Sequence, residues 1–375
     1  MRIAVTQVGD CLIADGINVF IYELSDALIH LGHEIYLVSG LAANVPVNGN
    51  ISAFERAVRE MFAVENVPRL VSLSFHSHAR DFLTFSMQQN ARFTFKGSET
   101  LNRISPDMVI FNGVTTTWCP HFKVAVNHDM QFRISALKYY DMLMYRTFDK
   151  LVATCTELKQ GLIKQFHLPQ SKISVIPICV DTSRFSSRVK NERQHIILHV
   201  GTRPEKRPET TIKAFARIAE TDPEVKLFVA GQIAPRQLDG CISGIREESI
   251  RQRIVILGRV SKEKLADLYA QAKVTCVPSD YNVPVCSPTV IESLASGTPV
   301  VGSIAAISQD ILVDGYSGYR VYPNDVEMFA GRLNTLITDD ELWAKMSKNS
   351  LAIAQRCDKT NVAKEYVSLY NESAR

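Results

Sequence analysis

The sequence predicts an α/β protein of two doubly wound domains, each a parallel β-sheet covered by helices. Short apolar runs alternate with longer amphipathic segments, which is typical of consecutive βαβ units. A length of 375 residues indicates two domains rather than one. Between two series of such units lies a polar stretch without apolar periodicity, residues 181–194 (DTSRFSSRVKNERQ), which we expect to be the interdomain linker.

The first series of units supplies the N-terminal sheet. In the first helix Val19, Leu24, Leu28 and Leu31 recur at helical spacing and form a stripe that faces the core. The expected strands are 3–8, 34–38, 108–111, 123–127, 151–153 and 173–176, and the expected helices are 17–31, 134–148 and 156–166.

The second series restarts the same alternation after the polar stretch. Its apolar runs predict a second parallel sheet, followed by two helices at the end of the chain. The expected strands are 195–200, 226–230, 253–257, 274–277 and 299–301, and the expected terminal helices are 340–356 and 360–370.

Composition narrows the class further. An apolar fraction of 46% with 22% charged residues is ordinary for a globular protein. The net charge of +3 is too small to indicate a nucleic-acid partner, and it allows transient contact with an anionic membrane without requiring it. Eight cysteines without a C-x-x-C pair argue against a zinc or redox motif.

We recognise no targeting sequence or membrane span in the sequence. The start, MRIAVTQVGD, has the pattern of a strand rather than of a signal peptide, and no apolar run approaches the roughly 18 residues of a membrane span. We therefore expect a cytoplasmic protein, with peripheral contact with a membrane left open.

Residues 277–302 (VPSDYNVPVCSPTVIESLASGTPVVG) carry the clearest functional pattern: a strand, a loop, a helix with one acid, and another strand. A helix that opens at Ser287-Pro288-Thr289 presents backbone N–H groups and the positive end of its dipole, which suit a phosphate. Pro288 fits the first turn, where an N–H is not needed. Glu292, about one turn further on, can accept hydrogen bonds from a sugar diol, so the segment predicts a nucleotide site.

This segment resembles the C-terminal signature of the GT-B glycosyltransferases, particularly the retaining family 4. The matching residues are Pro278, Ser279, Glu292, Ala295, Gly297, Pro299, Val300 and Val301. The family's first motif Glu falls on Pro284, with Asn282 as the nearest polar residue, and its Gly-Phe-Gly element is replaced by Cys286-Ser287-Pro288. The resemblance implies that Glu292 binds the ribose of a nucleotide sugar. The departures indicate a divergent donor loop, with loss of activity as the weaker alternative.

The resemblance extends over most of the chain. Asp15-Gly16 stands where the family has Gly-Gly, and residues 151–185 resemble its domain-crossing segment. Gly16 would let the backbone approach the donor phosphates. The implied plan is GT-B: two Rossmann-like domains facing across a cleft, with an acceptor-side domain at 1–182 and a nucleotide-sugar-binding domain at 183–356. A helix within 357–375 would pack back on the N-terminal domain.

Two loops of the second half complete the implied donor site. The sequence GTRPEKRPE after the strand at 195–200 is similar to the family loop that clamps the donor diphosphate, which points to Arg203, Lys206 and Arg207. The alternative is a solvated basic loop. Val260 lies in the loop whose backbone reads the nucleobase in the family. We find no D-x-D pair that would indicate a metal site.

In the first half, His128 follows the strand at 123–127 in the sequence VAVNHDM. A single His is more often structural than catalytic, but the carboxyl end of a strand is where sites form in such sheets. The resemblance assigns to His128 a contact with the transferred sugar. Residues 54–103, which include His76 and His78, correspond to a variable region that binds acceptors, and we assign them no other role.

The implied activity is retaining, metal-independent transfer of a sugar from a UDP- or GDP-linked donor. The donor is a substrate, no further cofactor is expected, and the acceptor is a glycan, a lipid-linked sugar or a small-molecule glycoside. Two alternatives remain: another GT-B enzyme, such as a nucleotide-sugar epimerase or a phosphorylase, and a sugar-nucleotide-binding protein without catalysis. Neither the acceptor nor the oligomeric state follows from the sequence.

Overall fold

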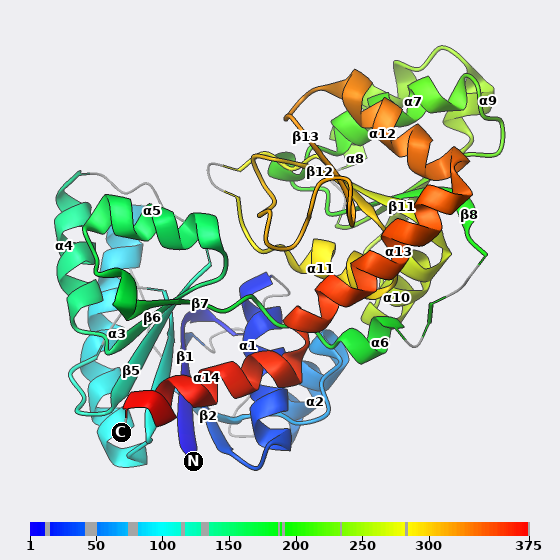
Figure 1. Cartoon of the computed structure of the whole chain (residues 1–375). Coiled ribbons are helices and arrows are strands. Elements are labelled where there is room, and N and C mark those ends of the chain that lie inside the picture. Colours follow the sequence, from blue (N-terminus) through cyan, green and yellow to red (C-terminus); the bar gives the residue numbers. More distant parts are fainter. Residues whose placement is uncertain are drawn as a thin grey trace. The chain divides into compact units, whose positions relative to one another are not determined.

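The protein forms two compact units in the computed structural model (Figure 1). One unit is Met1–Cys179 together with Lys359–Arg375, and the other is Val180–Asp358. The structure describes residues 1–11, 16–41, 51–73, 82–113, 117–128, 135–186, 188–189, 192–232, 235–281 and 284–373.

The first unit is built on a parallel sheet. Over its described residues, seven strands follow the order β3-β2-β1-β4-β5-β6-β7. The chain adds β2 and β3 on one side of β1 and the later strands on the other side, so sheet growth reverses between β1 and β4. The strands are β1 (Arg2–Asp10), β2 (Glu34–Leu41), β3 (Arg69–Ser72), β4 (Met108–Asn112), β5 (Phe122–Asn127), β6 (Lys150–Ala153) and β7 (Ile173–Val175). The helices are α1 (Gly16–His30), α2 (Ile51–Phe62), α3 (Phe82–Ile104), α4 (Ser135–Arg146), α5 (Thr156–Phe166) and α14 (Lys359–Ser373).

Both faces of this sheet are buried, which explains its nearly continuous apolar strands. One face packs under α3, α4 and α5 through a cluster that includes Phe93, Tyr145 and Leu158. Toward the other face, α14 runs alongside α1 (red and blue in Figure 1). Lys359, the first residue of α14, donates to Asp26 of α1 at 2.6 Å and so ties the two helices together.

Residues 54–103, left without elements in the sequence analysis, contain β3 and most of α2 and α3. In α2, Phe54, Val58 and Phe62 recur every four residues and are all buried, so a helical signal was present and was missed. In α3 the buried face includes Ser98 and Thr100. Because these buried residues are polar, a search for apolar residues at helical spacing does not detect the helix.

The second unit repeats the same architecture. Over its described residues, six parallel strands follow the order β10-β9-β8-β11-β12-β13, and growth of the sheet reverses between β8 and β11. The strands are β8 (Gln194–Val200), β9 (Lys226–Ala230), β10 (Ile254–Gly258), β11 (Ala272–Val277), β12 (Val300–Ser303) and β13 (Gly318–Val321). The helices are α6 (Thr182–Ser186), α7 (Pro208–Ala219), α8 (Pro235–Ser243), α9 (Glu248–Arg251), α10 (Lys262–Gln271), α11 (Pro288–Ala295), α12 (Val326–Thr338) and α13 (Asp340–Ala354).

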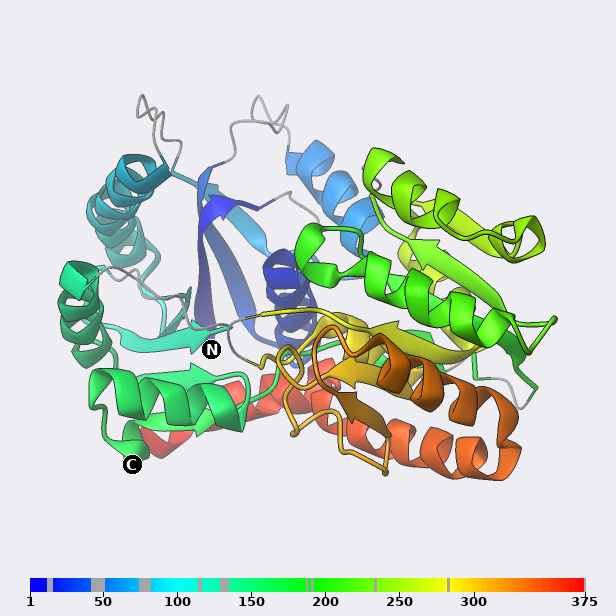
Figure 2. The same cartoon turned by 90° about the horizontal axis from the view of Figure 1, so that it is seen from above.

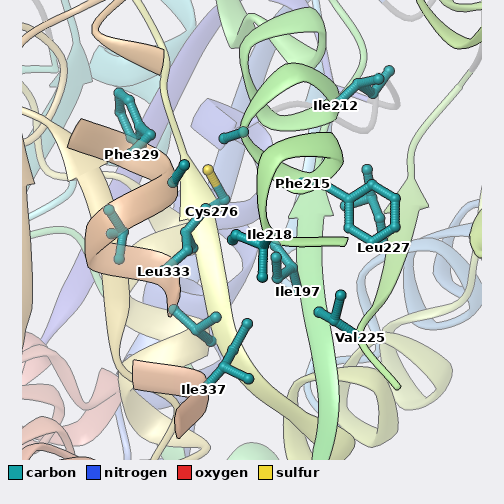
Figure 3. Packing of buried hydrophobic residues seen from close by; sticks show 14 of the residues in the cluster. Ile197, Ile212, Phe215, Ile218, Val225, Leu227, Cys276, Phe329, Leu333 and Ile337 are labelled. Carbon is teal, nitrogen blue, oxygen red and sulfur yellow. The ribbon is translucent and has the colours of Figure 1, made fainter. Parts of the chain in front are cut away.

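Two helices cover one face of this sheet. Phe215 and Ile218 of α7 meet Ile197 of the central strand β8, while Phe329 and Leu333 of α12 belong to the same buried cluster (Figure 3). The helix α13 follows α12 after a single residue and packs against it (orange in Figure 2). The predicted fold class, two Rossmann-like parallel-sheet domains, is confirmed.

Two local expectations are wrong. The expected linker 181–194 begins with the helix α6, in which Phe185 is fully buried with its ring 6.0 Å from that of Tyr269. Tertiary contact therefore gives residues 182–186 a helical structure that the polar sequence did not indicate. The strand β13 was not expected, since it is short and begins with a Gly. Gly318 has φ +152°, and a Cβ there would lie 1.9 Å from the carbonyl oxygen of Val300, so no other residue fits.

Among the described residues, none of the helices combines the length and apolar character that a membrane span requires.

Candidate functional site

The predicted donor residues of the second unit lie in loops at the carboxyl ends of its strands or in the helix α11 that follows one of these loops. The loop after β8 and the loop after β11 flank the point where sheet growth reverses, which is where open α/β sheets leave a crevice for ligands. The two loops are joined directly: the N–H of Asp280 donates to the carbonyl oxygen of Glu205 at 2.9 Å.

His199 and Lys206 shape the loop that follows β8. Gly201 has φ +101°, and a Cβ there would lie 3.0 Å from Cγ of Lys206, so the glycine lets the lysine stem pack over the backbone. Nε2 of the buried His199 lies 2.7 Å from the Gly201 carbonyl oxygen, which requires a proton on Nε2. Burial lowers the pKa of His199 to about 4, so a neutral imidazole holds the loop in place.

The three candidate cations of this loop are not equivalent. Arg203 pairs with Glu205 at 3.0 Å, and Arg207 pairs with Asp280 at 3.0 Å and with Glu209 at 3.5 Å. Lys206 makes no ion pair with the described residues, and its ammonium lies 5.5 Å from the centre of the Tyr281 ring. Lys206 is therefore the cation most available to a phosphate, a ranking that the sequence did not provide.

The N-terminus of α11, the expected anion-binding site, offers few free backbone N–H groups. Ser287 is the N-cap and Pro288 stands in the first turn, as predicted. The N–H groups of Val290 and Ile291 already donate to the Ser287 carbonyl oxygen, and Pro288 has no N–H. Within the described chain, the backbone donors left for an anion are those of Ser287 and Thr289. The Ser287 side chain is buried and makes no capping bond.

Glu292 is buried in α11 and held by two side chains of α10. Its Oε1 lies 2.5 Å from Nζ of Lys262, and its Oε2 accepts from the Tyr269 hydroxyl at 3.4 Å. Burial and the neighbouring carboxylate raise the pKa of Tyr269 well above its usual value, so Tyr269 stays a hydrogen-bond donor. The sequence analysis missed Lys262; the signal was a Lys in the first turn of a helix, where an acid is favoured.

Val260 lies between β10 and α10. The residue is half-buried, and Ser261 caps the helix that follows by accepting from the Lys264 N–H at 3.2 Å. The cap fixes the turn on which both Val260 and Lys262 stand.

In the first unit, His128 directly follows β5 and Gly16 begins α1. Nε2 of His128 lies 3.0 Å from Oδ1 of Asn112, at the end of the neighbouring strand β4. The amide nitrogen of Asn112 donates to the Thr6 carbonyl oxygen at 3.0 Å, so Oδ1 is the atom that faces His128 and accepts a hydrogen bond from Nε2–H. The tautomer of His128 therefore leaves Nδ1 as an acceptor.

Burial lowers the pKa of His128 to about 4, and the edge of the Phe20 ring packs against the imidazole, with centroids 4.9 Å apart. The ring is neutral at physiological pH and suits an acceptor of a hydroxyl hydrogen bond. Asn112, which the sequence analysis did not single out, holds the ring in this state.

Several residues of the sequence analysis, namely Asp15, His76, His78, Asp129 and Asn282, lie outside the described residues. Within the described part of the chain, no group of three His, Cys, Asp or Glu side chains is placed to hold a metal ion.

Comparison with known families agrees with this geometry. The family model "Glycosyltransferase Family 4" matches residues 14–184, and "Glycosyl transferases group 1" matches residues 181–352. Together they span both units, and the chain belongs to the GT-B glycosyltransferases of the family 4 type.

Individual relatives are distant. D-inositol 3-phosphate glycosyltransferase of Xylanimonas cellulosilytica is 25% identical over 248 residues, which cover 60% of this chain and 58% of that protein. The chain thus matches little more than half the length of this curated relative.

Solved structures share the fold. Sucrose-phosphate synthase from Thermosynechococcus elongatus aligns with a TM-score of 0.78 at 16% identity, covering 99% of this chain and 98% of that one. The Anabaena HepE protein, solved with UDP and glucose, aligns with a TM-score of 0.74 at 15% identity, covering 99% of this chain and 100% of that one.

Proposed function

We propose that this protein is a glycosyltransferase that moves a sugar from a nucleoside-diphosphate sugar to an acceptor hydroxyl group. The observation that carries the proposal is Glu292, a buried carboxylate one turn inside α11, together with two backbone N–H groups at that helix's start that make no hydrogen bond within the described part of the chain. The carboxylate can bind the ribose diol of a nucleoside diphosphate, and the N-terminus of the same helix can bind its phosphates.

Each predicted site residue has a role in this proposal. Glu292 accepts from the ribose hydroxyls, and the N–H groups of Ser287 and Thr289 receive the diphosphate together with Lys206. Arg203 and Arg207 lie in the same loop and contribute less, because carboxylates already pair with them. The backbone at Val260 contacts the nucleobase. Such preorganised donors stabilise the departing diphosphate; losing one costs about 3 kcal/mol, or roughly a hundredfold in rate.

We further propose that His128 contacts the transferred sugar through the acceptor atom Nδ1 and that Gly16 admits the donor phosphates. Family membership supports transfer with retention, without a metal ion and without a cofactor other than the donor itself. A UDP-linked donor is favoured over a GDP-linked one by relatives such as HepE, which was solved with UDP. The acceptor class remains a glycan, a lipid-linked sugar or a small-molecule glycoside.

The test is a thermal-shift titration of the full-length protein with UDP, GDP, ADP, CDP and dTDP, with Glu292→Ala as the comparison. A ligand at about a hundred times its Kd adds roughly 2.7 kcal/mol of stability, which raises the melting temperature by several degrees. We expect one diphosphate to stabilise the wild type and not the variant. Absence of a shift with all five would contradict the proposal.

A catalytically degenerate nucleotide-binding protein is the second candidate. It is favoured by Pro284 at the position of the first motif Glu and by the two carboxylates that already pair with Arg207. Hydrolysis of the donor sugar in the absence of acceptor separates the two, because only a competent transferase releases free sugar. The His128→Ala variant should bind the nucleotide normally and lose this hydrolysis.

A further inference from the structure

Lys262 and Glu292 form a buried ion pair across 30 residues of sequence. The ammonium of Lys262 lies 2.5 Å from Oε1 of Glu292, with 17% of the lysine side chain and 4% of the glutamate side chain exposed. The other carboxylate oxygen faces the Tyr269 hydroxyl. Glu292 thus meets positive charge on one side and a neutral hydrogen-bond donor on the other.

Stability alone does not account for this pair. Lys262 is the first residue of α10, where the helix dipole opposes a positive charge. Desolvation of two charges offsets most of their mutual attraction, so a buried pair of this kind adds little net stability over apolar residues. The pair is placed instead where the loop after β10, with Val260, comes close to the helix that carries Glu292.

We propose that Lys262 is a second ribose-binding residue, which acts with Glu292 to select ribonucleotide donors over 2′-deoxyribonucleotide donors. This inference rests on the proposed function, in which Glu292 receives the ribose. A ribose hydroxyl can donate its proton to Glu292 and at the same time accept a hydrogen from the Lys262 ammonium. A hydroxyl is the group that satisfies both partners, since it is donor and acceptor in one atom.

A donor without the 2′-hydroxyl leaves a buried charged group without its new partner. Sites built to hydrogen-bond a hydroxyl reject analogues that lack it, because the polar groups of the site then lose water without gaining the hydroxyl as a partner. Lys262 also holds the Glu292 carboxylate in one orientation before the donor arrives. The missing hydroxyl therefore lowers the affinity for a deoxyribonucleotide relative to that for a ribonucleotide.

The experiment measures Kd by calorimetry for two pairs of ligands, UDP with 2′-deoxy-UDP and GDP with 2′-deoxy-GDP. The proteins are the full-length wild type, Lys262→Met, Lys262→Gln, Lys262→Arg and the control Lys264→Met. Lys264 lies two residues further along the same helix and is exposed, so its variant removes the same charge outside the pair. Circular dichroism and the melting temperature establish that each variant is folded.

We expect the wild type to bind the ribonucleotide at least about tenfold more tightly than its deoxy analogue. Lys262→Met and Lys262→Gln should lower the affinity for the ribonucleotide and reduce the preference to less than about threefold, while Lys262→Arg retains part of it and Lys264→Met retains all of it. A merely structural ion pair would change the melting temperature and leave the preference intact.

Two results would overturn the assignment: a wild type that binds both members of each pair equally, or folded Lys262 variants that keep the wild-type preference. A wild type that binds none of the four ligands would refute the proposed UDP- or GDP-linked donor, and the role of Lys262 would fall with it. A failure confined to Lys262 leaves ribonucleotide binding by the wild type intact, so the two failures are distinguishable.

Discussion

At the residue scale, the chemistry of this site depends on which charges remain unpaired. Sequence reasoning placed Arg203, Lys206 and Arg207 in one basic loop. The structure separates them, because Asp280 lies 73 positions beyond Arg207 and still neutralises it. A motif therefore identifies the loop, whereas the identity of the available cation depends on residues far away in the chain.

We expect Lys206→Ala to weaken binding of UDP by roughly ten- to a hundredfold, the value of one charge-assisted contact of about 1.5–3 kcal/mol. Binding of uridine should stay unchanged, since the nucleoside lacks the diphosphate. The matched control is Arg203→Ala, which breaks an exposed ion pair and should change the affinity for UDP by less than about threefold. Calorimetric titrations with both ligands check this, and equal losses in the two variants would contradict the ranking.

At the element scale, Arg193 joins the ends of two helices beside β8. Its guanidinium donates to the carbonyl oxygen of Tyr269 in the last turns of α10 at 2.8 Å and to that of Ser296, which caps α11, at 2.6 Å. It also bonds the Thr298 hydroxyl at 3.1 Å and lies over the ring of Trp343. Burial lowers the pKa of Arg193 to about 10, which leaves it charged at neutral pH.

Replacement of Arg193 should therefore destabilise the second unit. We expect Arg193→Ala to lower the free energy of unfolding by about 3 kcal/mol, because two helix-terminal carbonyls lose a charged donor in a buried setting. Arg193→Lys should recover only part of this, since an ammonium cannot bridge both carbonyls. Urea unfolding measures the loss.

The control for this prediction is Arg217→Ala. Arg217 pairs with Glu327 at 3.1 Å on the surface of the same unit, and such an exposed pair contributes less than about 1 kcal/mol. Equal effects of the Arg193 and Arg217 variants would show that Arg193 does not act as a helix-end donor.

At the scale of the whole molecule, each unit contains a neutral histidine with a lowered pKa, half-buried in the case of His128 and buried in the case of His199. Burial lowers the pKa of His128 in the first unit and of His199 in the second to about 4, against 6.5 in the unfolded chain. Between pH 6.5 and 4 the unfolded chain therefore binds more protons than the folded one. Stability should fall as the pH is lowered through this window and should not depend on these two groups above pH 7.

Urea midpoints measured from pH 7.5 to 5 test this dependence, in a range where most carboxylates have yet to titrate. Burial also lowers the pKa of His33 and His121, which shift the first unit in the same direction. His199→Gln should flatten the pH dependence of the second unit, and His128→Gln should flatten part of that of the first. A midpoint constant over this range would show that neither histidine is buried in the neutral form.

The sequence by itself determined most strands of the two Rossmann-like sheets, the first and last helices and the segment that carries Glu292. These features are local: apolar period, helix caps and a proline at a first turn are all visible among near neighbours. The helix α2 was equally visible, in the spacing of Phe54, Val58 and Phe62, and was overlooked.

Only the tertiary structure decided which side chains meet. The pairing of Lys262 with Glu292, of Arg207 with Asp280, and of His128 with Asn112 depends on strand order and on the points where sheet growth reverses. Those contacts join residues from different strands and helices, and no local pattern in this chain encodes which loop will face which. The physical reason is that parallel strands bring their carboxyl ends to one edge of a sheet whatever their separation in sequence.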